Sequence, residues 1–375
     1  MAVGRRSFLR GVLFSFLYIS LAASSLPAHS QSQCSSAHPP VIFNFGDSNS
    51  DTGALVAGLG FPIDLPNGRS FFHASAGRLS DGRLVLDFLC QSINTSFLTP
   101  YLDSLSGSTF TNGANFAVVG SSTLPKFVPF SLHIQVMQFL HFRARSLQLG
   151  KPITQQGFHD ALYMIDIGQN DIADSFAKNM SFTQVAERIP TVLAQIEDGV
   201  KSLYDGGGRK FWIHNTGPVG CLPQKLSMVK DKDLDPIGCI SSYNRAALLF
   251  NEGLRRSCEK MRSQLRDSTI VYVDIYSIKY DLIANATKYG KFLERHELRF
   301  ASPLMACCGF GGPPYNYDIR VPCGQPASEV CGVGSRSVSW DGIHYTEAAN
   351  EFVASKVLST AYSVPRLRFN FFCRS

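Results

Sequence analysis

Two segments far apart in the chain carry the residue types of a serine nucleophile and its base. Ser48 lies in the segment GDSNS at residues 46 to 50, and Asp341 precedes His344 by three residues near the C-terminus. A serine becomes an effective nucleophile only when a base removes its proton and a third group orients that base. In a turn that enters a helix, residues three apart share a face. We therefore predict that Asp341 holds the Nδ1 proton of His344 while Nε2 faces Ser48.

Two further polar turns supply hydrogen-bond donors for a developing negative charge. Gly120 follows the apolar run 114–119, and Asn170 follows the apolar run 161–167. A backbone N–H of Gly120 and a side-chain N–H of Asn170 could both donate to the oxyanion that forms when a carbonyl is attacked. The alternative for Asn170 is a structural role as the cap of a helix or turn.

The elements that position these residues are predicted to alternate between strands and helices. Runs rich in Val, Ile, Phe and Tyr predict strands at 41–45, 114–119, 161–167, 210–214 and 269–274. Apolar residues at intervals of three and four predict helices over 183–204 and 241–266, and Pro190 should kink the first or split it in two. This alternation is typical of a mostly parallel sheet with helices on both faces, where ligands bind beyond the carboxyl ends of the strands.

Four sequence blocks occur in order at the ends of these elements. They are FNFGDSNSDTG at 43 to 53, GANFAVVGSS at 113 to 122, DIGQND at 166 to 171 and WDGIHYTEAAN at 340 to 350. Together they resemble the plant-type GDSL esterases and lipases of the SGNH hydrolase superfamily.

The resemblance covers nearly all of the chain after residue 30. It implies an α/β fold, namely a flavodoxin-like three-layer α/β/α sandwich with a mostly parallel five-stranded sheet. It assigns the nucleophile to Ser48, the rest of the triad to Asp341 and His344, and the oxyanion donors to Gly120 and Asn170. It implies no cofactor and no metal.

Other interpretations of these segments need residues that the chain lacks. A calcium-binding EF-hand beginning at Asp47 would not have Thr52 and Gly58 at its sixth and twelfth positions. An α/β-hydrolase elbow would have glycine where Ser50 stands. A dinucleotide-binding G-x-G-x-x-G does not follow the first predicted strand, and HELRF at 296–300 lacks the second histidine of a zinc protease.

The N-terminus has the features of a secretory signal peptide over residues 1–30. Arg5 and Arg6 precede the apolar run 11–23, and the small residues Ala28 and Ser30 occupy the −3 and −1 positions of a cleavage site. The apolar run is too short to span a bilayer. We expect one hydrolase domain over residues 31–375, no integral membrane segment in the mature chain, and an extracellular location in the cell wall or apoplast.

The ten cysteines fit an oxidising compartment, in which we expect them to form disulfides. Cys221 and Cys239 flank a polar loop that a disulfide could close. The Gly-, Pro- and Cys-rich segment 307–334 is predicted to be a long surface loop held by disulfides, and its four cysteines allow three pairings. Glycosylation sequons are present at Asn94, Asn179 and Asn285.

Composition indicates a globular protein, because 45% of the 375 residues are hydrophobic and only 17% are charged. The net charge of +6 includes three arginines of the first 30 residues. Positive and negative residues are interspersed elsewhere, so nucleic acid is not an expected partner.

Asp51 and Asp171 are expected to stabilise their loops. Structural or surface roles are expected for six histidines: His73, His133, His141, His159, His214 and His296.

These observations predict a secreted serine esterase or lipase that cleaves acyl or acetyl esters of a small molecule or glycan through an acyl-enzyme. Two alternatives remain open. The same triad could transfer the acyl group to an acceptor alcohol, or the fold could serve as a non-catalytic extracellular protein that binds a glycan or lipid.

Overall fold

The computed structural model describes residues 1, 34, 39–103, 105–126, 128–289 and 300–373. The predicted signal peptide, apart from Met1, lies outside the described residues. All helices and strands below belong to one compact unit, Gln33–Ser375.

A six-stranded sheet forms the centre of this unit, in the order β10-β5-β4-β3-β1-β2. The strands are β1 (Ile42–Gly46), β2 (Gly113–Asn115), β3 (Leu162–Asp166), β4 (Lys210–His214), β5 (Thr269–Val273) and β10 (Ser363–Val364). The first five are parallel and follow the flavodoxin-like order 2-1-3-4-5, which confirms the predicted fold.

The prediction of five strands was wrong by one. Strand β10 pairs antiparallel with β5 at the edge of the sheet. It has two residues and ends directly before Pro365, so it is too short to give a periodic signal. Strand β2 is also shorter than its apolar run, although the N–H groups of Phe116 and Val118 still bond to carbonyls of β1.

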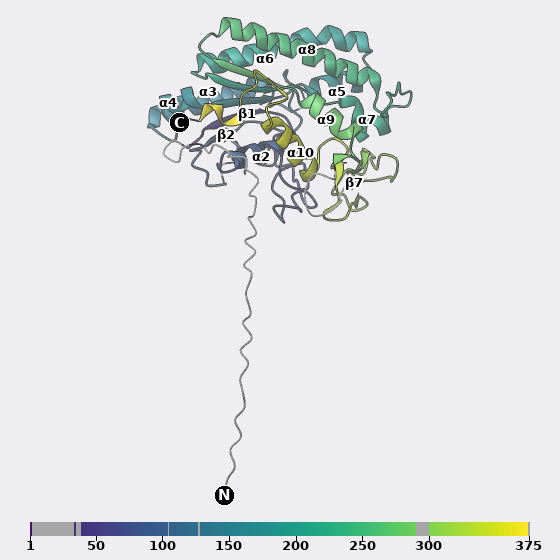
Figure 1. Ribbon diagram of the computed structural model, residues 1–375. Helices are drawn as coiled ribbons and strands as arrows, with labels where there is room; N and C mark the ends of the chain where they lie inside the picture. Colours follow the sequence, from purple (N-terminus) through teal and green to yellow (C-terminus); the bar gives the residue numbers. More distant parts are fainter. Residues whose placement is uncertain (2–33, 35–38, 104, 127, 290–299, 374–375) are drawn as a thin grey trace. The chain divides into compact units, whose positions relative to one another are not determined.

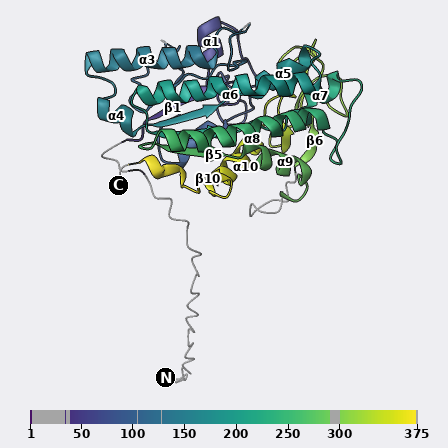
Figure 2. The ribbon, with the colours of Figure 1, turned by 90° about the horizontal axis from the view of Figure 1, so that it is seen from above.

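Helices cover both faces of the sheet (Figure 1). One face packs against α3 (Leu132–Leu149), α5 (Gln169–Ala177), α6 (Phe182–Asp205) and α8 (Ser241–Gln264). The other packs against α2 (Val85–Ser92), α9 (Ile275–Ala284) and α10 (Glu347–Leu358). Figure 2 shows α3, α6 and α8 side by side. Successive strand residues face opposite layers, so Phe43 packs on the first side and Ile42 on the second.

Shorter elements connect these layers and extend from them. They are α1 (Ala54–Leu59), α4 (Gln155–Asp160), η1 (Val219–Cys221), α7 (Pro223–Met228), β6 (Ala301–Ala306), β7 (Cys308–Gly309), β8 (Glu329–Val330), β9 (Ser337–Ser339) and η3 (Phe369–Phe372).

Helix α6 contradicts the expectation that Pro190 would split it, because it runs unbroken through this residue. Pro190 is exposed, whereas Ile189 and Val192 are buried against the core. Proline has no backbone N–H, so the carbonyl of Ala186 lacks its usual intrahelical donor. This carbonyl lies on the side of the helix that water can reach. Burial of the opposite face stabilises the helix against the local cost.

Four disulfides form in the structure: Cys34–Cys373, Cys221–Cys239, Cys307–Cys331 and Cys308–Cys323. The predicted Cys221–Cys239 pair is confirmed, and the 307–334 segment adopts one of its three possible pairings. The expectation that all ten cysteines pair was wrong, because Cys90 and Cys258 are free thiols buried in the core. Each lies on the apolar stripe of a helix and packs as a small hydrophobic residue.

We expect alkylation without reductant to modify no thiol in the native protein and two thiols, Cys90 and Cys258, after denaturation. Burial raises the pKa of both thiols and shields them from reagent. Peptide mapping by mass spectrometry checks this result. Alkylation of Cys307, Cys308, Cys323 or Cys331 under these conditions would contradict the pairing described above.

Candidate active site

Three polar turns meet at the carboxyl edge of the sheet. Ser48 follows β1, Gly120 lies beyond β2 and Asn170 follows β3. Strand β1 lies between β2 and β3, so the Ser48 turn lies between the other two. This is the position at which the strand order reverses, where open α/β sheets bind their ligands.

A buried glutamine on α3 holds the start of the Ser48 turn. Gln135 is completely buried; its Oε1 accepts the N–H of Gly46 at 2.9 Å and its Nε2 donates to the Gly46 carbonyl at 2.8 Å. A side chain at Gly46 would place its Cβ 2.4 Å from the Asp166 carbonyl oxygen. Glycine is therefore required there, and Gln135 adds two hydrogen bonds to the last residue of β1.

Buried asparagines fix the other side of the same turn. Asn115 donates from Nδ2 to the Ser50 carbonyl at 2.6 Å and to Thr52 Oγ1 at 2.9 Å. Asn44 donates to Asn115 Oδ1 at 2.8 Å and to Ser50 Oγ at 3.0 Å. Because each amide bonds both to the turn and to its neighbour, the backbone around Ser48 has little freedom to move.

The loop-stabilising roles expected of Asp51 and Asp171 are present. Asp51 accepts the N–H groups of Gly53, Ala54 and Leu55 at the start of α1, and also that of Val119 at 2.8 Å. Asp171 accepts the N–H and hydroxyl of Thr123. Asp51 thus joins the turn containing Gly120 to the Ser48 turn, and Asp171 joins it to the Asn170 turn.

The turns that contain the two predicted oxyanion donors lie on either side of the Ser48 turn. Gly120 has φ +80°, and within the described residues its N–H donates to no other group. The Asn170 amide donates to the Ser121 carbonyl at 2.8 Å and lies 3.5 Å from Asp47 Oδ2. Helix α5 has Gly168 as its N-cap, so Asn170 lies inside the first turn and does not cap its own helix. Asn170 is therefore not the cap of its own helix, and its hydrogen bond to the Ser121 carbonyl links it to the turn that contains Gly120.

Asp341 and His344 make the contact that their spacing predicts. His344 Nδ1 lies 2.6 Å from Asp341 Oδ2, and Asp341 Oδ1 accepts the N–H groups of Ile343 and His344 at 2.9 and 2.8 Å. Burial alone would raise the pKa of Asp341, but the charge of His344 and these hydrogen bonds hold it below its ordinary value. His344 Nε2 is buried and has no hydrogen-bond partner among the described residues.

Backbone hydrogen bonds from the disulfide-linked segment 307–334 hold the two residues directly before Asp341. Cys307 N–H donates to the Ser339 carbonyl at 3.0 Å, and Cys308 N–H donates to the Trp340 carbonyl at 2.7 Å. The fully buried Trp340 donates from Nε1 to Asn67 Oδ1 at 2.9 Å. The residues directly before Asp341 are therefore fixed by a covalently closed loop. Helix α10 begins at Glu347, so Asp341 and His344 lie in the turn that precedes it, as their spacing predicts.

Two observations bring the Ser48 turn and the His344 segment together. The charge of His344 lowers the pKa of Asp47, which burial and the carboxylate of Asp166 together raise to about 6. Lys279 Nζ lies 3.5 Å from Asn49 Oδ1 and 4.1 Å from the centre of the Tyr345 ring. The residues that follow Ser48 and His344 therefore contact the same ammonium group.

Sequence reasoning missed Gln135, Asn44, Asn115 and Lys279. Each of these residues is a polar side chain at a core position of a strand or helix, and this pattern is visible in the sequence. The pattern does not indicate which distant segment the side chain contacts. Among the six histidines given structural or surface roles, His73, His133, His141 and His159 are exposed. His214 is buried and accepts a hydrogen bond from Trp212, while His296 lies outside the described residues.

The three sequons differ in accessibility. Asn94 and Asn179 are exposed, each at a positive φ. Asn285 is half-buried, and its amide donates to Asp281 at 2.7 Å.

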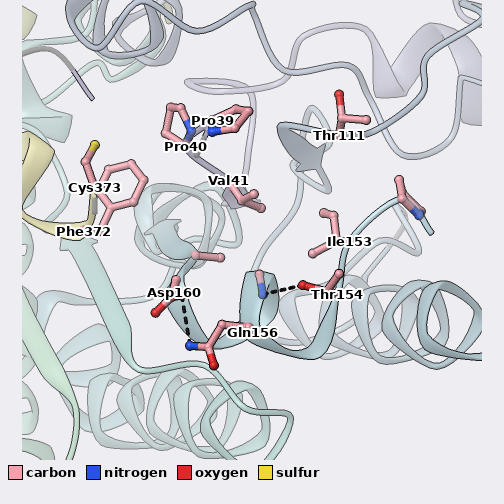
Figure 3. A pocket seen from close by; sticks show the side chains of 13 residues that line it. Pro39, Pro40, Val41, Thr111, Ile153, Thr154, Gln156, Asp160, Phe372 and Cys373 are labelled. Atoms are coloured by element: carbon pink, nitrogen blue, oxygen red, sulfur yellow. Dashed lines mark hydrogen bonds between the residues drawn. The ribbon is translucent and has the colours of Figure 1, made fainter. Parts of the chain in front are cut away.

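A cavity of 320 Å³ lies away from these residues (Figure 3). Its lining includes Val41 before β1, Ala161 before β3, and Phe372 near the C-terminus. It therefore opens at the amino ends of the strands. Figures 1 and 2 both show α4, which contributes to the lining, at the opposite end of the unit from α7. This cavity is separate from the site around Ser48.

Comparison with known proteins places the chain in a family. The model of the GDSL-like lipase/acylhydrolase family matches residues 42–357. The chain belongs to this family. It is therefore a member of a family of ester-bond hydrolases, as the four sequence blocks predict.

Plant relatives are similar over almost their whole length. One GDSL esterase/lipase of Arabidopsis thaliana is 63% identical over 343 residues, which cover 89% of this chain and 90% of the relative. The GDSL esterase/lipase LIP-4 of the same plant is 60% identical over 377 residues, covering 98% and 99%. A protein named alpha-L-fucosidase 3, also of Arabidopsis thaliana, is 40% identical over 373 residues, covering 92% and 96%.

Two features are absent from the part of the chain that the structure describes. No group of three or more His, Cys, Asp or Glu side chains there could hold a metal ion. In the same residues no helix combines the length and apolar character needed to cross a membrane.

Proposed function

We propose that this GDSL family member is a secreted serine esterase in which Ser48 is the nucleophile, His344 the base and Asp341 the orienting acid. The observation that carries the proposal is the Asp341–His344 contact of 2.6 Å, which leaves a buried His344 Nε2 without a partner among the described residues. A histidine held in this way has its Nδ1 protonated and its Nε2 free to accept a proton.

The proposed reaction uses these residues as follows. Ser48 Oγ attacks the ester carbonyl while His344 Nε2 takes its proton, and the carbonyl oxygen becomes an oxyanion. The N–H of Gly120 and the amide of Asn170 donate to that oxygen. Collapse of the tetrahedral intermediate expels the alcohol, which receives the proton from His344 and leaves an acyl group on Ser48. Water then attacks this acyl-enzyme with His344 again as base, and Ser48 is released.

The remaining parts of the proposal concern substrate and location. The substrate is a carboxylic ester of a small molecule or glycan, with an acetyl or longer acyl group. Four disulfides in the structure and the sequence of residues 1–30 support secretion into the cell wall or apoplast, with Asn94, Asn179 and Asn285 as glycosylation sites.

Turnover on a panel of acetyl, butyryl and long-chain aryl esters, with and without an acceptor alcohol, tests this function. Hydrolysis in water supports the proposal. Dominant transfer to the acceptor would instead favour the acyltransferase alternative, and absence of turnover on every ester would favour the binding protein. An aryl α-L-fucoside is included because of the relative with that name, and we expect it to remain uncleaved.

Substitution of Asn170 separates catalysis from structure. If its amide donates to the oxyanion, Asn170→Ala should lower kcat by about 10²–10³-fold with little change in KM, because the bond forms mainly in the transition state. Asn170→Asp should be at least as harmful, since it places a negative charge beside the oxyanion. Steady-state kinetics and Tm of both variants check this. An active, normally stable Asn170→Asp would show that the residue is structural.

A further inference from the structure

Helix α9 contains a lysine in a place where lysine is rarely found. Lys279 is 5% exposed, and it lies on the same buried face as Ile278 and Leu282. A buried ammonium is costly unless other groups replace the water that it loses. The groups that contact Lys279 must therefore stabilise its charge.

Lys279 lies between the two halves of the active site. Its Nζ is 3.5 Å from Oδ1 of Asn49, the residue after Ser48, and 4.1 Å from the ring centre of Tyr345, the residue after His344. Gly217 packs against the stem, because a Cβ there would lie 3.0 Å from Lys279 Cδ. The ammonium thus contacts both segments, and its stem has little room to move away.

From Lys279, a chain of polar contacts runs through the two residues on either side of Ser48 in the sequence. Asn49 Nδ2 donates to Asp47 Oδ1 at 2.9 Å, and the N–H of Asn49 donates to the same oxygen at 2.9 Å. Asp47 Oδ2 lies 3.5 Å from the amide of Asn170. One buried cation is thereby connected, through Asn49 and Asp47, to the proposed oxyanion donor.

Two carboxylates interact electrostatically with the ammonium. Burial lowers the pKa of Lys279, and the charges of Asp166 and Asp47 oppose that shift. Asp166 also lies 3.5 Å from His214 Nδ1. Burial alone would raise the pKa of Asp166, but the hydrogen bond and charge of His214, together with the charge of Lys279, hold it below its ordinary value. The positive charge of Lys279 thus opposes the repulsion between the carboxylates of Asp47 and Asp166.

We propose that Lys279 is a positioning residue. Through its contacts with Asn49 and Tyr345, it fixes the position of the Ser48 turn relative to the His344 segment. This rests on the proposed roles of Ser48 and His344. Lys279 acts on the geometry of the reacting groups and does not contact the substrate. Its loss is therefore expected to affect the chemical step more than substrate binding.

A double-mutant cycle with Lys279→Met and Asn49→Ala tests the proposal in the full-length protein. Methionine retains most of the volume of the lysine stem but removes the charge. Lys279→Met should lower kcat by about 10²-fold, the loss that a misplacement of about 1 Å causes, with KM within about twofold of wild type. Asn49→Ala should lower kcat in the same way. The double variant should be no slower than the slower single variant, because both changes break one connection.

The control is Lys260→Met on α8, whose Nζ binds Glu197 at 2.7 Å on the surface. It should keep wild-type kcat. A folded Lys279→Met with unchanged kcat would overturn the proposal, as would effects that multiply in the double variant. If Lys279→Met does not fold, Asn49→Ala decides, since unchanged kcat there would also overturn it. Fluorophosphonate labelling of wild-type Ser48 is measured first, because its absence would refute the proposed function itself.

Discussion

Ser48→Ala should lower kcat for ester hydrolysis by about 10⁶-fold, the size of loss found when the nucleophile of another serine hydrolase is removed. The Ser48 hydroxyl is the atom that forms the acyl-enzyme in the proposed mechanism, so its removal leaves that mechanism without a nucleophile. The fold should survive, because the turn is held by Gln135, Asn44 and Asn115 through hydrogen bonds to Gly46 and Ser50. Kinetics on an aryl acetate, with Tm as the measure of folding, check both expectations.

The matched control for this variant is Ser355→Ala on α10. Its hydroxyl is exposed and donates to the Phe352 carbonyl at 2.7 Å. It should retain full activity. If Ser48→Ala kept more than a few per cent of wild-type activity in a clean preparation, Ser48 could not be the nucleophile.

Asp341→Asn should lower kcat by about 10⁴-fold at neutral pH. The reason lies in the two backbone N–H groups, of Ile343 and His344, that bond to Asp341 Oδ1. They would hold the oxygen of the new amide on their side and turn its NH₂ toward His344 Nδ1. That nitrogen must then accept a hydrogen bond, so the proton moves to Nε2 and the base is lost.

Asp318→Asn provides the comparison for Asp341→Asn. Asp318 bonds to Arg320 outside the site, so this variant should keep its activity. A decrease of less than tenfold in Asp341→Asn would contradict the orienting role. If Asp341→Asn does not fold, Asp341→Ser takes its place, and a folded Asp341→Ser that kept its activity would contradict the role equally.

The sequence predicted the parallel strands because each is an apolar run that ends at a polar turn. It also predicted the Asp341–His344 contact, which depends only on residues three apart. Strand β10 was missed because two residues carry no period. Helix α6 was expected to kink or split at Pro190. It does not split, because burial of Ile189 and Val192 outweighs the lost hydrogen bond.

The polar groups that hold the site were harder to foresee. Gln135 bonds to Gly46 and Lys279 approaches Asn49, yet each lies on a helix far along the chain from the turn it supports. A buried polar side chain indicates that a partner exists, but the partner is chosen by the three-dimensional packing of the layers. The disulfide pairing of segment 307–334 depended on the same packing, since Cys307 and Cys308 are held beside Ser339 and Trp340.

The central claim is that the turn after β1 carries the reactive serine. Its most direct measurement is peptide mapping by mass spectrometry after brief treatment of the native protein with a fluorophosphonate, which reacts with activated serines. We predict one adduct, on Ser48, formed rapidly in wild type and in Ser355→Ala, but slowly in Asp341→Asn. An unmodified Ser48, or an adduct on another serine that persists in Ser48→Ala, would contradict the account.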